Sequence, residues 1–412
     1  MNCATVKYCS KVGFVTMVAS WLFGTAFAAP QPASQLKPKQ PISDQVFKNV
    51  QVLKGIPVDD FMGTMGIMCA ALGFDCSECH VGAGTEKVVW AADNPRKLMA
   101  RRMIRMMTAI NRDNFGDRQM VTCWSCHRGR DRPLTTPTLE NIYGPVAQDM
   151  DDVLVQAPGQ PPAEKILDKY LQAVGGTQRL ATMKSYVATG TSVGFGGFGK
   201  GGQVEIVANF PDQQATSIVF PKEPDRGTSV RTFNGREAWL RTPLTVLDEY
   251  QLTGGELDGA KLDAQLAFPA QIKNVLTDLR VSMPTTISDL PAPSSQTVEQ
   301  TKTVGIGKDR LVNVVQGRGP RGIYATLYFD QQSSLLLRLV RYGPSPIGRV
   351  PTQIDYSDYR DLGGIKIPFH ILFAWSGGRD EFQLNQVQIN VPVDPAKFGR
   401  PAPEKPKEHE HH

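Results

Sequence analysis

The pentapeptide Cys-x-x-Cys-His occurs twice in this chain, as CSECH at 76–80 and as CWSCH at 123–127. Together the two copies hold four of the seven cysteines among 412 residues. Few kinds of site use two cysteines separated by two residues and followed by histidine, so this motif restricts the local structure more than any other feature. Which kind of site it forms depends on the redox compartment, and the N-terminus indicates that compartment.

The N-terminus has the pattern of an export signal. Lys7 and Lys11 precede an uncharged apolar stretch that closes on Ala26, Phe27 and Ala28, the A-x-A pattern of a signal-peptidase site. We therefore predict that residues 1–28 are a cleaved signal peptide and that the protein is exported to a bacterial periplasm. The alternative is an uncleaved anchor in the inner membrane, because the stretch approaches the roughly 20 residues of a spanning helix.

Cysteine use in an exported chain normally indicates disulfides, but the distribution here does not fit a disulfide framework. Cleavage would leave five cysteines, all within one short stretch of a large protein: Cys69, Cys76, Cys79, Cys123 and Cys126. A thioredoxin-like motif gives no reason for the histidines, and a zinc ribbon needs its pairs about 15 to 20 residues apart, closer than these motifs lie.

Covalent haem c explains the whole motif. The two thiols form thioethers with the haem vinyl groups, and the adjacent histidine becomes an axial ligand of the iron. We predict two covalently bound haem c groups. The first is attached through Cys76 and Cys79 with His80 on its iron, and the second through Cys123 and Cys126 with His127 on its iron.

A methionine-rich helix is predicted before each motif. In the first, Asp59 and Asp60 suit the first turn and Gly73 suits the C-terminal end. In the second, Pro95 suits the first helical position, and apolar residues recur at spacings of four, three and four: Met99, Met103, Met106 and Ile110. Beyond the two motifs, the chain offers histidine only at 370, 409, 411 and 412. A sixth iron ligand is therefore expected from a methionine thioether, the alternative being that these methionines only fill the core.

The stretch from about 46 to 130 resembles the cytochrome subunit of photosynthetic reaction centres. The resemblance is carried by "FMGTMG" before CSECH, by "ARRMIRMMTAIN" and by "VTCWSCHRG". It covers the first two haem units of that four-haem subunit, in which a helix methionine is the sixth ligand. Carried over by position, this implies Met65 for the first haem and Met103 for the second. Two motifs are present here instead of four.

The second half of the chain alternates apolar and polar residues between turn signals, which predicts a largely antiparallel sheet. Through "LYFDQQSSLLLRLVRYG" and "DYSDYRDLGGIKIPF" it resembles LolA-like periplasmic lipoprotein carriers, whose curved sheet can hold an acyl chain. The glycine-rich "GFGGFGKG" at 194–201 lacks the Ser or Thr of a phosphate loop, so a hairpin tip is predicted there.

The predicted fold class is therefore multidomain: a small α-helical dihaem cytochrome c domain followed by a mainly antiparallel β half-barrel of the α+β class. The predicted organisation is a signal peptide at 1–28, a linker at 29–44, the cytochrome domain at 45–135, a linker at 136–162, the β-rich domain at 163–398 and a disordered tail at 399–412.

These features predict an exported dihaem c-type cytochrome that carries electrons between periplasmic or membrane redox partners, with the β-rich domain as a binding or docking unit. An electron-transfer protein is favoured over an enzyme. The alternatives are a peroxidase-like haem enzyme with one open iron site and a lipid- or lipoprotein-binding protein with a haem sensor. The mild net charge of +5 gives no case for nucleic acid as a partner.

Overall fold

The structure is a computed structural model that describes residues 41–83, 85, 87–137, 139, 142, 153–194, 201–221, 227–242, 247–288 and 309–402. The predicted signal peptide, most of the predicted glycine-rich hairpin tip and residues 403–412 of the predicted tail lie outside this range. None of the helices in the described part is long and apolar enough to span a membrane.

Helices dominate the segment up to residue 137, and both predicted methionine-rich helices are confirmed. They are α2 (Val58–Leu72) and α3 (Pro95–Phe115), and the shorter α1 (Ser43–Val46), η1 (Cys76–Glu78) and α4 (Cys123–His127) accompany them. The Asn94 side chain accepts a hydrogen bond of 2.9 Å from the Lys97 backbone N–H, which caps α3 ahead of Pro95. Both long helices end at a glycine in the left-handed conformation, Gly73 after α2 and Gly116 after α3.

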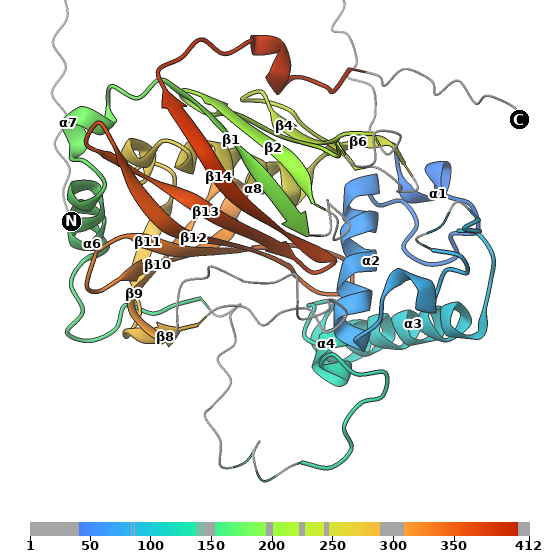
Figure 1. Cartoon of the computed structure of the whole chain (residues 1–412). Coiled ribbons are helices and arrows are strands. Elements are labelled where there is room, and N and C mark those ends of the chain that lie inside the picture. Colours follow the sequence, from blue (N-terminus) through green and yellow to red (C-terminus); the bar gives the residue numbers. More distant parts are fainter. Residues whose placement is uncertain are drawn as a thin grey trace, which may run out of the picture. The chain divides into compact units, whose positions relative to one another are not determined.

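The rest of the chain is built around one sheet, and the predicted antiparallel pairing is confirmed. Every neighbouring pair of strands is antiparallel, in the order β6-β5-β4-β3-β2-β1-β14-β13-β12-β11-β10-β9-β7, with β8 beside β9. The pairing of β1 with β14 joins a meander of the first six strands to a meander of the later ones (Figure 1). The strands are β1 (Ser185–Gly194), β2 (Gly202–Asn209), β3 (Gln213–Val219), β4 (Ser229–Phe233), β5 (Ala238–Arg241), β6 (Glu249–Leu252), β7 (Thr277–Val281), β8 (Thr285–Ile287), β9 (Arg310–Arg318), β10 (Tyr324–Asp330), β11 (Leu336–Gly343), β12 (Val350–Leu362), β13 (Ile365–Trp375) and β14 (Gly378–Ile389).

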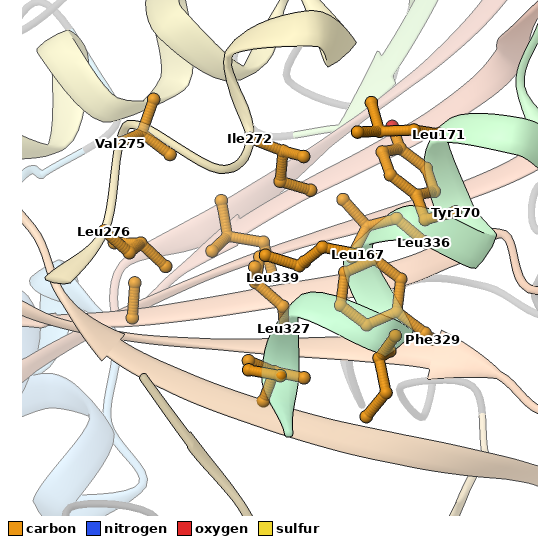
Figure 2. Close-up of a cluster of buried hydrophobic side chains, with 14 of the residues drawn as sticks. Leu167, Tyr170, Leu171, Ile272, Val275, Leu276, Leu327, Phe329, Leu336 and Leu339 are labelled. Atoms are coloured by element: carbon orange, nitrogen blue, oxygen red, sulfur yellow. The ribbon is translucent and has the colours of Figure 1, made fainter. Parts of the chain in front are cut away.

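Helices cover part of one face of the sheet and form the main core with it. They are α6 (Ala163–Ala173), α7 (Thr177–Leu180) and α8 (Gly254–Leu266). Leu167 and Tyr170 of α6 pack with Leu327, Phe329 and Leu339 of the sheet, as Figure 2 shows. The amphipathic pattern of α6 explains this packing, because its apolar residues recur on one side of the helix.

The helical segment packs directly on the sheet segment. Ile67 of α2 and Met107 of α3 are buried together with Ile347 and Val350 at the start of β12. The buried carboxylate of Asp59 accepts hydrogen bonds from the backbone N–H and the hydroxyl of Thr253, at the start of α8. Two further hydrogen bonds run from the Gln119 side chain to the Ser345 carbonyl and from the Cys123 N–H to the Ile347 carbonyl. The division into separate domains at 135 and 163 stays a prediction.

The first residues of the predicted tail contact the sheet. Thr232 donates a hydrogen bond of 2.9 Å to the Gly399 carbonyl, and the Arg241 guanidinium donates to the carbonyls of Pro401 and Ala402 at 3.2 and 2.7 Å. Arg241 is buried, so these carbonyls satisfy donors that would otherwise lack water. Residues 399–402 are therefore held against the sheet by these hydrogen bonds.

Candidate haem sites and the adjoining cavity

The first Cys-x-x-Cys-His motif forms a tight turn directly after α2. The Asp75 side chain accepts a hydrogen bond of 2.7 Å from the Ser77 N–H, which starts the 3-10 turn η1. The His80 N–H then bonds to the Cys76 carbonyl at 2.9 Å. This turn brings the histidine back beside its two cysteines, and all three residues line one cavity.

The His80 ring is oriented for metal binding. Its Nδ1 lies 3.3 Å from the Trp90 carbonyl oxygen, and a carbonyl can only accept, so Nδ1 carries the proton. Nε2 is then left with its lone pair, which is the arrangement that metal-binding histidines usually have. Burial, and secondarily the Lys97 ammonium, lowers the pKa of His80 and so favours this neutral form.

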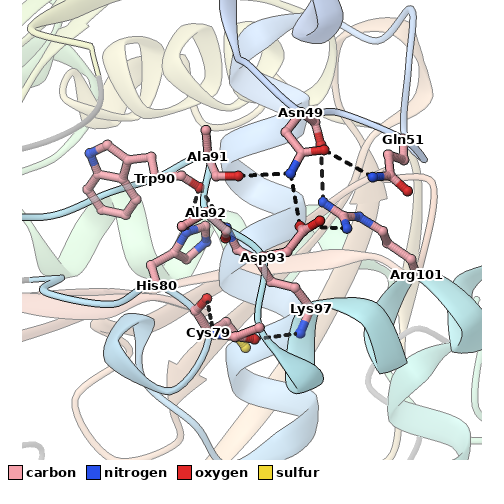
Figure 3. A network of polar contacts seen from close by, with 11 residues as sticks. Asn49, Gln51, Cys79, His80, Trp90, Ala91, Ala92, Asp93, Lys97 and Arg101 are labelled. Atoms are coloured by element: carbon pink, nitrogen blue, oxygen red, sulfur yellow. Dashed lines mark hydrogen bonds and ion pairs between the residues drawn. The ribbon is translucent and has the colours of Figure 1, made fainter.

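A polar network holds the Trp90 loop in place (Figure 3). The Lys97 ammonium donates to the carbonyls of Trp90 and Ala92 at 2.6 and 2.7 Å. Arg101 pairs with Asp93 at 2.7 Å, and Asn49 donates to the same carboxylate at 2.9 Å. The carbonyl that orients His80 is therefore itself fixed by groups from α3 and from the chain ahead of α2.

The second motif is the helix α4, and its histidine has the same arrangement. Thr122 and Ser125 form a capping box at its start, with hydrogen bonds of 3.1 and 3.2 Å between side chains and backbone. At its end His127 Nδ1 lies 3.0 Å from the Arg130 carbonyl oxygen. Again Nδ1 is the donor and Nε2 is left for a metal.

The two motifs lie close to one another because α4 packs on α2. The Gly129 N–H donates to the Ala71 carbonyl at 2.9 Å, and a Cβ on Gly73 would lie 2.5 Å from the Gly129 carbonyl oxygen. Two conditions therefore favour glycine at position 73: its φ of +67°, and the close approach of the Gly129 carbonyl oxygen, which leaves no room for a Cβ. Because Cys76 lies three positions after Gly73, and His127 two positions before Gly129, the two motifs are within about 25 Å of each other.

The candidate sixth ligands have different surroundings at the two sites. Met62, Met65 and Met68 all line the cavity that holds the first motif. Met103 does not line it; it is half-buried on α3 between two exposed methionines, Met99 and Met106. The roles of Met65 and Met103 as ligands, like those of the four cysteines and two histidines, stay predictions.

Cys69, near the C-terminal end of α2, lies beside the first motif. Its thiol is within hydrogen-bonding reach of the Cys76 thiol, and that contact, together with burial, raises the pKa of Cys69 well above its ordinary value. All five described cysteines are free thiols. Among the described residues, no three His, Cys, Asp or Glu side chains gather as a metal site.

The cavity beside the first motif has a volume of about 1290 Å³ and extends from the motif across one face of the sheet. More than one side of α2 lines it. Phe61, Met65 and Cys69 follow one another along one side of the helix, Gly63 lies nearly opposite Met65, and Gly66 lies between these two sides with its Cα toward the sheet. Sequence patterns did not indicate this continuity, because the lining strand residues have the ordinary alternation of any sheet.

A cluster of acidic groups lies where α2 meets α8. Asp59 and Glu256 line the cavity, with Arg231 of β4 at 3.5 Å from the Glu256 carboxylate. Burial, followed by repulsion from Asp59 and Glu256, raises the pKa of Asp60 to about 6. Burial also raises the pKa of Asp59, against the hydrogen bonds from Thr253 that lower it.

Two cysteines separated by two residues and followed by histidine are the haem-attachment motif of c-type cytochromes. The comparisons agree: residues 19–153 match the family described as photosynthetic reaction centre cytochrome C subunit, as the sequence resemblance predicted. The reaction center cytochrome c subunit of Thermochromatium tepidum is 35% identical over 98 residues, which are 23% of this chain and 23% of that protein. This part of the chain is therefore similar to a family of c-type cytochromes, a class of proteins that bind haem covalently and transfer electrons.

Solved structures similar to this chain include a LolA superfamily protein from Nitrosomonas europaea. It is 12% identical with a TM-score of 0.36 and covers 58% of this chain and 98% of its own. A DUF1329 family protein from Desulfovibrio piger is 12% identical with a TM-score of 0.37, with the same two coverages.

Proposed function

We propose that this protein is an exported dihaem c-type cytochrome that carries electrons between redox partners in the periplasm or at its membrane. Cys76 and Cys79 attach one haem and Cys123 and Cys126 the other. His80 and His127 are the proximal ligands, with Met65 and Met103 opposite them. The observation that carries the proposal is the hydrogen bond from each histidine Nδ1 to a backbone carbonyl, because it leaves Nε2 of both rings ready for iron.

Two features support a carrier over a peroxidase-like enzyme. Three methionine side chains line the cavity of the first motif, so a thioether is at hand to close the sixth position of that iron. The contact between Gly73 and Gly129 keeps the two motifs close, which suits electron exchange between two haems. A carrier has two low-spin haems, whereas a peroxidase-like enzyme has one high-spin haem that binds small ligands.

Mass spectrometry of the denatured mature protein tests the proposal. We expect the mass of a chain beginning near Ala29 plus two haems, because thioether bonds survive denaturation. Changing Cys123 and Cys126 together to alanine should remove one haem, and Cys69→Ala, the matched control at a cysteine outside both motifs, should keep both. A mass without haem, or haem that dissociates on denaturation, would contradict covalent attachment.

A further inference from the structure

The cavity extends far beyond the first Cys-x-x-Cys-His motif. Along β12 its lining residues occur at every second position, Val350, Thr352, Ile354 and Tyr356, followed by Tyr359. At about 3.3 Å per residue these positions span about 30 Å. On the neighbouring strand β13, the residues Ile367, Ile371, Phe373 and Trp375 line the same space. This part of the cavity is therefore a long channel with mostly apolar and aromatic walls.

One end of this channel lies against α2. Gly66 faces the turn between β13 and β14, where a Cβ would lie 2.8 Å from the Ser376 hydroxyl, and Gly63 faces Val350. Because both positions are glycine, backbone without side chains forms the wall of the channel there. Met65 lies about 100° around the same helix from Gly66 and lines the same cavity, so an occupant of the channel would lie within about one helix diameter of the first haem site.

The polar groups at this end restrict the chemistry of an occupant. Asp59 and Glu256 line the cavity and Asp60 lies next to them, while Arg231 is the cation paired with this group. Of the other cations that line the cavity, Lys97 is bonded to backbone carbonyls, Arg101 is paired with Asp93, and Lys366 lies at the far end of β13 from Trp375. Two carboxylates lining this end of the cavity would repel a carboxylate or phosphate head group. They can accept hydrogen bonds from hydroxyls, and Arg231 can donate to a carbonyl.

We propose that the channel along β12 and β13 binds an isoprenoid quinone or quinol, with its uncharged head group beside Arg231 and Glu256 and its tail along the apolar strands. The inference rests on the proposed electron-carrier function, because a redox-active head group one helix away from a haem site is useful to such a protein. An apolar tail suits a channel of this length, and the head group offers the hydroxyl or carbonyl oxygens that the polar end can recognise.

Equilibrium dialysis of the haem-loaded protein against decylubiquinone tests the proposal, with the bound quinone measured by its ultraviolet absorbance after extraction. We expect saturable binding of one molecule per chain. Palmitate, which has an apolar tail but an anionic head, should bind at least tenfold more weakly. Glu256→Gln removes one of the two lining carboxylates, so it should strengthen palmitate binding and narrow the difference in affinity between palmitate and the quinone.

Two substitutions that fill the channel keep the test independent of any one variant. Ile371→Trp on β13 places bulk inside the channel, and Thr216→Phe on β3 places bulk in the same cavity beside Arg231, its partner on β4. Each should weaken quinone binding at least tenfold. Ser217→Phe, the matched control, alternates to the other face of β3 and should bind as the unchanged protein does.

Absence of saturable binding by a protein that carries both haems would overturn this inference and leave the proposed function standing. Palmitate binding as tight as quinone binding would overturn the assignment of the head group. A protein that binds the quinone but lacks covalent haem would instead contradict the proposed function, so the two failures are distinguishable.

Discussion

At the scale of single residues, Met65 and Met103 are the proposed sixth ligands, and they can be tested separately. Met65→His and Met103→His should each keep the iron low-spin, because imidazole replaces thioether as a strong axial ligand. Each should abolish about half of the near-infrared sulfur-to-iron band of the oxidised protein and lower one of two reduction potentials, since thioether sulfur stabilises ferrous haem relative to imidazole.

Neighbouring methionines provide matched controls for this experiment. Met62 lines the same cavity as Met65, and Met106 lies one helical turn from Met103 with 47% of its surface exposed. Met62→His and Met106→His should leave the band and both potentials unchanged. If Met106→His removes half of the band and Met103→His does not, the ligand of the second haem is Met106 and Met103 only packs.

Asp60 gives the protein a pH dependence of stability with a definite sign. Burial and the neighbouring carboxylates raise its pKa from 3.8 to about 6, so the folded state binds a proton more tightly than the unfolded state does. The stability that this proton contributes is present below about pH 4 and is lost as the pH rises through 6.

Asp60→Asn should therefore raise the free energy of unfolding at pH 7 by about 1 kcal/mol, less than the full shift implies because the side chain is partly exposed. The difference from the unchanged protein should shrink between pH 6 and pH 4, as followed by urea denaturation. Asp113→Asn, on the exposed surface of α3 where the pKa is lowered by Arg112, should show no such gain at pH 7. A constant difference across this pH range would contradict the assignment.

At the scale of elements, α2 contacts both the first haem motif and the sheet, and its two interior glycines, Gly63 and Gly66, lie at the contact with the sheet. Gly63→Ala should stabilise the protein by about 0.5–1 kcal/mol, because alanine favours the helix and its Cβ would lie 3.7 Å from Val350, an ordinary contact. Gly66→Ala should lose this gain, because its Cβ would meet the Ser376 hydroxyl at 2.8 Å and the Gly377 backbone at 3.4 Å.

Thermal denaturation of the two variants measures this difference, and the Gly66→Ala, Ser376→Gly double variant should recover part of the gain. Equal stabilisation by both single substitutions would show that α2 does not approach the sheet at Gly66.

At the scale of the whole molecule, buried contacts join the helical segment to the sheet segment. Asp59 bonds to Thr253, and Ile67 and Met107 pack with Ile347 and Val350. We therefore expect the two segments to unfold together, with haem absorbance and far-ultraviolet circular dichroism changing at the same urea concentration. Thr253→Val leaves the buried Asp59 carboxylate without the hydroxyl donor, so it should lower the free energy of unfolding by about 1–3 kcal/mol. Two separated transitions in the unchanged protein would show that the segments are independent domains.

The sequence alone predicted much of this protein, because the features concerned are local. The spacing of Cys76, Cys79 and His80 lies within one turn, and the signals of Asn94, Pro95 and Gly73 act on the residues next to them. The alternation that predicted an antiparallel sheet is likewise set strand by strand. For the same reason the haem motifs, both helices and the strand-rich second half could be recognised without coordinates.

The tertiary structure decided which distant segments meet. The carbonyls of Trp90 and Arg130 orient the two histidines, yet a carbonyl leaves no trace in the sequence because every residue has one. The approach of Gly73 to Gly129, and the channel that joins the first motif to β12 and β13, depend on how α2 packs against α4 and the sheet. Local patterns specify which face of an element is buried, but the partner of that face is fixed by the packing of the whole chain.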